Sequence, residues 1–170
     1  RRTGCYPGLH RVLVYPGAFF VERLQPGAAG VLQERRDLLS GESWSQGQVI
    51  LSWADVVEGA SVPDDGRNVA IHEFAHQLDQ ETGFANGAPR LGSRERYARW
   101  SQVLAAAFHA AQPGTAEVPP LISGYGASSP AEFFAVTAEV FFEQPRRLAA
   151  EFPDLYRELA AYFRVDPALW

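Results

Sequence analysis

The amino-acid sequence predicts an α+β fold, in which a small mixed sheet from the N-terminal part of the chain packs against C-terminal helices. The composition, with 46% hydrophobic and 21% charged residues in a chain of 170, is typical of one globular domain with a sizeable core. Apolar residues before about residue 60 come in short runs, whereas later ones recur at helical spacing. We therefore expect a single domain over residues 1–170.

The N-terminal part, from His10 to Gly59, has the pattern of strands and turns. Its apolar runs are RVLVYP, AFFVE, VLQERRDLLSGESW and GQVILSW, and prolines and glycines interrupt them. The run GQVILSW carries β-branched and aromatic residues, which suit a strand. Two interpretations of it stay open: an exposed edge that pairs with an extended peptide, or an internal strand buried under the helices.

Helical periodicity begins near Arg67 and predicts a first helix that ends at about Gln80, with Asn68 at its start. A second helix is marked by apolar residues at helical spacings, namely Tyr97, Trp100, Val103, Leu104 and Phe108.

A third helix is predicted in SSPAEFFAVTAEVFFEQP, where Ser129 suits the N-cap, Pro130 the first turn and Pro145 the stop. The next segment, PRRLAAEFPDLYRELAAYF, predicts two short helices that separate near Pro153. Between the second and third helices, AQPGTAEVPPLISGYGASS predicts a loop of about 18 residues, a length that is usually functional in a compact domain.

The first predicted helix contains the stretch NVAIHEFAHQLDQETG, in which His72 and His76 are four residues apart. Residues at this spacing lie one turn apart on the same face, so both imidazoles can bind one ion. Glu73 lies about 100° around the helix, where it can reach a water on the open side of that ion as a general base. Zinc suits such a site because it binds imidazole nitrogen and makes water acidic near neutral pH.

A catalytic zinc site needs a third protein ligand. A three-histidine site of the HExxHxxGxxH type would require a histidine at the position of Thr82, and the only other histidines are His10 and His109. The third ligand should therefore be an acid. The third predicted helix offers three candidates on nearly one stripe, Glu132, Glu139 and Glu143, and periodicity does not choose among them.

Three blocks of the sequence together resemble a known family. The blocks are SGESWSQGQVILSWADVVEGA, NVAIHEFAHQLD and YGASSPAEFFAVTAEVFFEQP, in this order. The chain is similar to the Mlc titration factor A family of zinc metallopeptidases, which is distantly similar to the catalytic domain of anthrax lethal factor. The resemblance implies a zincin-type fold, one Zn²⁺ per chain and aminopeptidase-like hydrolysis of small peptides. It also implies that a helical segment found at the start of family members is missing here.

The resemblance also assigns roles to individual residues. In the family a tyrosine precedes the third ligand by seven residues, and Tyr125 and Glu132 meet that spacing, so the resemblance selects Glu132 as the ligand. Tyr125 would then face the metal and donate to the oxyanion of a tetrahedral intermediate. A regulatory alternative comes from the family name: a protein that sequesters a transcriptional repressor, with a structural or secondary zinc site.

Other interpretations of these acids and of the tyrosine remain open. Glu132 stands three residues after Ser129, so it could instead close a capping box. Glu139 is either an acid that orients a ligand or a surface glutamate, and Tyr125, between two glycines, could simply fill a gap. Asp79 either holds an imidazole through its second nitrogen or lies solvated near the helix end.

The remaining composition narrows the class of protein. The net charge of −5 gives no support to direct nucleic-acid binding, and no apolar run reaches the length that crosses a bilayer. A single cysteine, Cys5, cannot form an internal disulfide and fits a reducing compartment. We therefore expect a cytoplasmic protein whose partner is a peptide or protein substrate, or a repressor protein.

Overall fold

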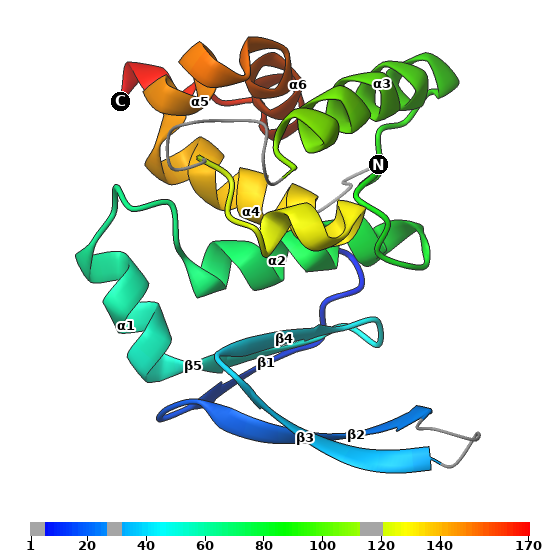
Figure 1. Ribbon diagram of the computed structural model, residues 1–170, viewed down its shortest axis with the longest axis vertical. Coiled ribbons are helices and arrows are strands. Elements are labelled where there is room, and N and C mark those ends of the chain that lie inside the picture. Colours follow the sequence, from blue (N-terminus) through cyan, green and yellow to red (C-terminus); the bar gives the residue numbers. More distant parts are fainter. Residues whose placement is uncertain (1–5, 27–31, 113–120) are drawn as a thin grey trace.

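The structure is a computed structural model that describes residues 6–26, 32–112 and 121–170. Cys5 and a large part of the predicted loop lie outside these ranges. The described residues form five strands and six α-helices (Figure 1). In chain order these are β1 (Arg11–Tyr15), β2 (Phe19–Pro26), β3 (Leu32–Leu39), β4 (Gly41–Trp44), β5 (Gln48–Ser52), α1 (Trp53–Ser61), α2 (Val69–Asp79), α3 (Arg94–Ala110), α4 (Pro130–Glu143), α5 (Pro145–Glu151) and α6 (Pro153–Phe163).

Three strands form a small mixed sheet in the order β1-β5-β4. Strand β5 pairs in parallel with β1 and antiparallel with β4, where Gly41 lies opposite Leu51. The proposal that GQVILSW offers an exposed edge is wrong, because β1 and β4 occupy both edges of β5 and its Val49 is fully buried. The alternative, an internal strand, is confirmed. Strands β2 and β3 form a separate antiparallel ribbon.

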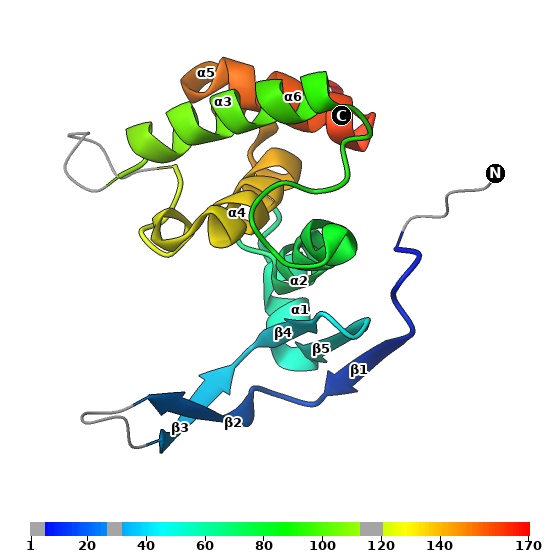
Figure 2. The same ribbon diagram turned by 90° about the vertical axis from the view of Figure 1, so that its right-hand side faces the viewer.

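The helices form layers above the sheet, as the sequence pattern predicts. Helix α2 lies between the sheet and α4, with which it shares its most extensive helix–helix contact, and α3, α5 and α6 lie beyond α4 (Figures 1 and 2). The β2–β3 ribbon extends away from this stack on the side opposite the helices (Figure 2). The largest fully buried side chains in the interior of the stack include Trp100 from α3 and Phe133, Phe134 and Phe141 from α4.

Most predicted helix ends coincide with the observed ones because capping residues define them. Asn68 and Ser129 are the N-caps of α2 and α4, and their side chains accept hydrogen bonds from backbone N–H groups in the first turn. Pro145 and Pro153 each begin a new short helix, α5 and α6. None of the helices in the described ranges is long and apolar enough to cross a membrane.

Helix α1 was not predicted, because the segment up to Gly59 was assigned to strands and turns. The observed helix is short and contains the β-branched pair Val56 and Val57, so its apolar pattern resembles the preceding strand. Its N-terminal signal is nevertheless present: Ser52 caps the helix through a bond from the Asp55 N–H to its hydroxyl.

Candidate metal centre

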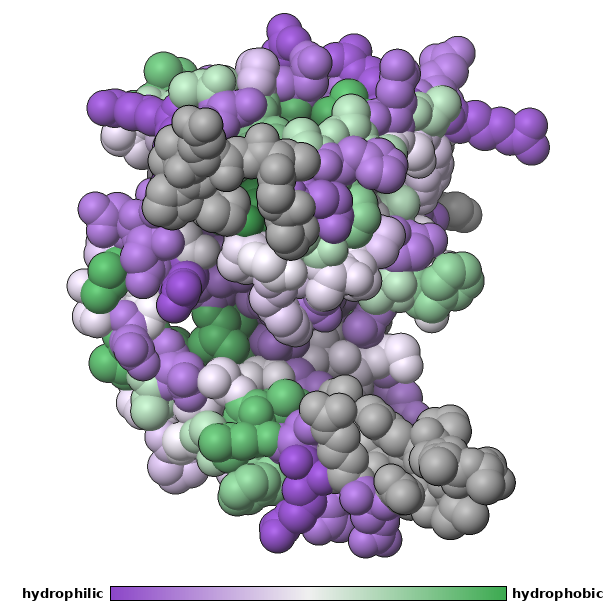
Figure 3. All heavy atoms as spheres, viewed as in Figure 1, coloured by the Kyte–Doolittle hydropathy of each residue, from purple (hydrophilic) through white to green (hydrophobic). Residues whose placement is uncertain are grey.

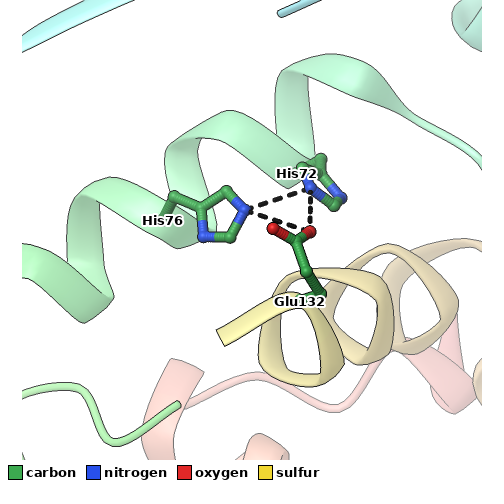
Figure 4. A group of neighbouring side chains, drawn as sticks. All are labelled: His72, His76 and Glu132. Atoms are coloured by element: carbon green, nitrogen blue, oxygen red, sulfur yellow. Dashed lines mark hydrogen bonds and ion pairs between the residues drawn. The ribbon is translucent and has the colours of Figure 1, made fainter. Parts of the chain in front are cut away.

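The two histidines of the HExxH stretch meet on one face of α2. Their Nε2 atoms are 3.1 Å apart, with the rings at a steep angle to one another (Figure 4). Both rings point toward Glu132 in the first turn of α4 (Figure 4). The spacing of four residues therefore produces the two-pronged arrangement that the sequence predicts.

Helix α4 supplies the third side chain from its first turn. The Oε2 atom of Glu132 lies 3.1 Å from His72 Nε2 and 3.5 Å from His76 Nε2 (Figure 4). The three atoms that could bind a metal all lie within 4.8 Å of one another, and we call His72, His76 and Glu132 the metal-ligand cluster. Two imidazole nitrogens and one carboxylate oxygen are a donor set that suits zinc and leaves a position open.

The capping interpretation of Glu132 holds only for its backbone. Ser129 Oγ accepts a hydrogen bond from the Glu132 N–H at 3.2 Å, as a cap requires. The carboxylate, by contrast, turns to the histidines instead of closing a capping box on Ser129. The same residue thus begins the helix with its backbone and joins the metal-ligand cluster with its side chain.

Hydrogen bonds within the cluster shift the pKa values of His72 and Glu132 so that both charged forms are favoured. Burial alone would lower the pKa of His72, but hydrogen bonds to Glu132 and Glu139 outweigh it and raise the pKa to about 10. Burial likewise opposes ionisation of Glu132, but bonds from His72, His76 and Tyr125 hold its pKa well below the usual range. An ionised carboxylate beside the positively charged imidazole of His72 is an environment in which a cation can replace a proton.

Glu139 orients His72 from the side opposite the metal position. Its Oε1 atom accepts a hydrogen bond from His72 Nδ1 at 2.7 Å, and its Oε2 atom accepts one from the Asn68 N–H. When Nδ1 donates to Glu139 and a cation replaces the proton on Nε2, the Nε2 lone pair is directed at the cluster. Glu139 is buried and bonds to His72, so it is not a surface glutamate.

Glu143, the third acid of the stripe, binds the start of α2 and not the histidines. Its carboxylate accepts bonds from the Arg67 N–H at 2.9 Å and from Asn68 Nδ2 at 3.0 Å. The three acids of α4 therefore make different contacts with α2. Glu132 contacts the Nε2 atoms of the two histidines, Glu139 bonds to Nδ1 of His72, and Glu143 bonds to the residues that begin α2.

Glu73 lies beside the metal-ligand cluster, against strand β4. A Cβ atom placed on Gly41 would be 2.6 Å from both Cγ and Oε1 of Glu73, so β4 approaches this side chain as closely as a glycine allows. Burial raises the pKa of Glu73 to about 7, although the neighbouring His72 and His76 act in the opposite direction. The sequence analysis did not identify Gly41 as a residue that packs against Glu73. Its only sequence signal is a glycine at the start of the segment GESW.

Tyr125 stands at the end of the long loop with its ring 5.9 Å from that of His72. The ring is 61% exposed, whereas its hydroxyl hydrogen-bonds to the carboxylate of Glu132. Partial burial and the charge of Glu132 raise the pKa of the phenol, which is therefore a proton donor at neutral pH. The described end of the loop thus brings Tyr125 to the metal-ligand cluster.

Asp79 differs from both of its sequence-based interpretations. It is fully buried, so it is not a solvated acid, and its Oδ2 accepts a hydrogen bond from the Gly87 N–H at 2.7 Å. Among the described residues no hydrogen bond joins it to His76. Its hydrogen bond from Gly87 connects the end of α2 to the segment that follows it.

One member of the cluster, His72, lines a cleft of about 490 Å³ between the β3–β4 junction and helices α1 and α2. Figure 3 shows this side of the molecule hollowed between the sheet layer and the helices. His72, Glu73, Tyr125 and Glu139 all line the cleft, together with Leu38, Leu39, Ser40 and Gly41. His72, Glu73 and Tyr125 therefore share one space that is accessible from outside.

Comparisons with known proteins show the family to which this chain is related. Residues 1–164 match the family model for glucose-regulated metallo-peptidase M90. An uncharacterized protein of Synechocystis sp. is 39% identical over 166 residues, covering 96% of this chain and 60% of its own. Proteins called Mlc titration factor A are 39% identical over 168 residues in Pectobacterium atrosepticum and 38% over 164 residues in Escherichia coli O127:H6. These matches cover 96% and 94% of this chain, and 62% and 61% of those relatives, so the chain spans about three fifths of their length.

Proposed function

The chain belongs to the glucose-regulated metallo-peptidase M90 family, and on that premise we propose that it is a zinc-dependent peptidase with a zincin-type fold. The supporting observation is that potential ligand atoms of His72, His76 and Glu132 lie within 4.8 Å of one another. Of these three residues, His72 lines the same cleft as Glu73 and Tyr125. We further propose aminopeptidase-like hydrolysis of small peptides by one cytoplasmic domain over residues 1–170, as the family resemblance implies.

The three ligands hold the metal in this proposal. A zinc ion held by these residues would supply Lewis acidity, which lowers the pKa of a bound water toward neutral. Glu139 keeps the Nε2 atom of His72 directed at the site through its bond to Nδ1.

Glu73 is the general base and acid of the proposed reaction. It takes a proton from the attacking water and returns it to the amine that leaves, and a pKa of about 7 allows both transfers at neutral pH. Its burial against Gly41 limits the positions that its carboxylate can adopt. Tyr125, protonated at neutral pH, donates a hydrogen bond to the oxygen on which negative charge develops.

The test combines metal content with turnover on one set of purified proteins. Elemental analysis and a panel of short fluorogenic peptides would be applied to the wild type, to Glu73→Gln and to a control, Glu95→Gln. Glu95 is an exposed acid in the first turn of α3, outside the cleft. We expect one zinc per chain in all three, and turnover at least about 100-fold lower in Glu73→Gln alone. Retained turnover in Glu73→Gln would rule out Glu73 as the base.

A second candidate function is regulatory, because two of the compared relatives are called Mlc titration factor A. The chain would then bind a repressor protein, and its zinc would be structural or secondary. A binding assay with purified Mlc, using the wild type and Glu73→Gln, separates the two functions. Zinc and Mlc binding without turnover in the wild type would favour the regulatory function.

A further inference from the structure

We propose that the cleft binds an extended peptide whose apolar side chain lies on the cleft end of the β2–β3 ribbon, against Phe20 and Leu38. This inference rests on the proposed peptidase function and adds a substrate class to it: peptides with an aliphatic or aromatic residue near the reacting bond. We call Phe20 and Leu38 the ribbon patch.

The ribbon patch is a pair of side chains on one face of the ribbon. Phe20 and Leu38 are directly opposite each other in the β2–β3 register, so their side chains project from the same face. They are 61% and 60% exposed. Covering two large, adjacent and mostly solvated apolar side chains lowers the free energy, because it removes apolar surface from water.

Along the same face of the ribbon, the apolar pair near the cleft is followed by a charged pair. The next pair on the same face is Glu22 and Arg36, whose side chains form an ion pair at 3.5 Å. The Arg36 guanidinium also lies 4.8 Å from the centre of the Phe20 ring and so helps to hold that ring in place. The face therefore changes from charged to apolar toward the cleft, and Figure 3 shows apolar atoms gathered beside the hollow.

The ribbon patch is continuous with the proposed catalytic residues. Leu38 itself lines the cleft together with His72 and Glu73. The chain then runs from Leu38 directly to Gly41, the residue that contacts Glu73. The three residues from Leu38 to Gly41 span at most about 10 Å, so a bound peptide would cover the same distance with about three extended residues.

This geometry favours a peptide as the occupant of the ribbon patch. A peptide whose carbonyl reacts beside Glu73 and which extends toward β3 would place a side chain on Leu38 within about three residues of the reacting bond. The apolar surface thus lies where such a chain would pass. The acidic residues on the α1 side of the cleft offer no comparable apolar support.

The experiment measures peptide binding without turnover. In the Glu73→Gln background, alanine-based hexapeptides carrying a fluorescent label and a single Leu or Ser would be titrated by fluorescence anisotropy, with the variable residue moved along the peptide. We expect the Leu peptide to bind at least about tenfold more tightly than the Ser peptide at one or two positions. Leu38→Ser and Phe20→Ser should each reduce that ratio toward one.

The matched control is Leu169→Ser, which removes an 81% exposed leucine near the C-terminus, outside the cleft, and should leave the ratio unchanged. Leu38→Thr, whose β-branched side chain suits a strand, repeats the test if Leu38→Ser folds poorly. A ratio near one in the parent, or an unchanged ratio in every variant of the ribbon patch, overturns the proposal. So does a change in oligomeric mass without a change in peptide affinity, because a second copy would then cover the ribbon patch.

The outcomes also separate this inference from the peptidase function. Selective binding that depends on the ribbon patch, with no turnover by the wild type on any peptide, would retain the peptide surface and reject the peptidase function. Turnover by the wild type that does not depend on the ribbon patch would retain the peptidase function and reject the surface.

Discussion

At the scale of single residues, Glu139 has a role that can be separated from helix stability. We expect Glu139→Ala to weaken zinc binding about 10- to 100-fold, because His72 loses the partner that orients it and holds its tautomer. Glu143→Ala is the control, since Glu143 also holds the start of α2 but does not contact an imidazole. A titration with a competing chelator measures both affinities. An equal loss in the two variants would mean that Glu139 acts only through the helix start.

Gly41 is a second residue whose role can be tested directly. In Gly41→Ala the new methyl group would lie 2.6 Å from Glu73 and 2.8 Å from Val69, so the carboxylate must move. We expect kcat to fall about 10- to 100-fold while zinc content stays constant, because small displacements of a catalytic group are costly. Gly17→Ala, whose Cβ would contact nothing within 4 Å, is the control. A change in KM alone would instead indicate that Gly41 contributes to binding.

At the scale of elements, Asp79 connects the end of α2 to the segment around Gly87. Burial raises its pKa above the ordinary value, although bonds from Gly87 and Asn86 partly offset this. The ionised form is therefore disfavoured in the folded protein, and this cost disappears as the pH falls through the folded-state pKa. Asp79→Asn carries no such charge.

The difference in the free energy of unfolding between wild type and Asp79→Asn should therefore change with pH. As the pH falls from 7 toward 4, we expect it to shift in favour of the wild type, by about 1.4 kcal/mol for each unit by which folding raises the pKa. Urea unfolding of both proteins at several pH values measures this. A difference that is constant with pH would show that Asp79 has the same pKa in both states.

The sequence was most informative about elements that carry capping signals. Asn68 and Ser129 marked the starts of α2 and α4, because a side chain that caps a helix acts on its own first turn. Such local information did not identify the neighbours of β5, which depend on contacts between distant segments. It also missed α1, where Ser52 and Asp55 give a cap signal beside a strand-like pattern.

At the scale of the whole molecule, the site depends on how α2 and α4 pack. Periodicity placed Glu132, Glu139 and Glu143 on one stripe but could not say which of them reaches the histidines, and only the family spacing from Tyr125 selected Glu132. The packed structure separates their contacts, because successive levels of α4 lie against different parts of α2. Residue spacing alone contains no information on the offset between two helices.

A metal ion bound by these ligands would link α2 to α4, and its removal should therefore lower the stability of the whole molecule. A ligand that binds only the folded state stabilises it by about 2.7 kcal/mol at a free concentration 100 times its Kd. In a chain of this size each 1 kcal/mol shifts the Tm by about 2 to 4 °C, so we expect the chelated protein to unfold roughly 5 to 10 °C lower.

Thermal unfolding followed with and without a chelator, and again after zinc is restored, measures the effect. His76→Ala provides the control, because a chain that lacks one ligand should show little shift with zinc. Glu73→Gln should keep the full shift, since Glu73 lies beside the ligands and is not one of them. A shift that survives in His76→Ala would place the stabilising ion elsewhere, whereas its loss in Glu73→Gln would mean that Glu73 helps to hold the metal.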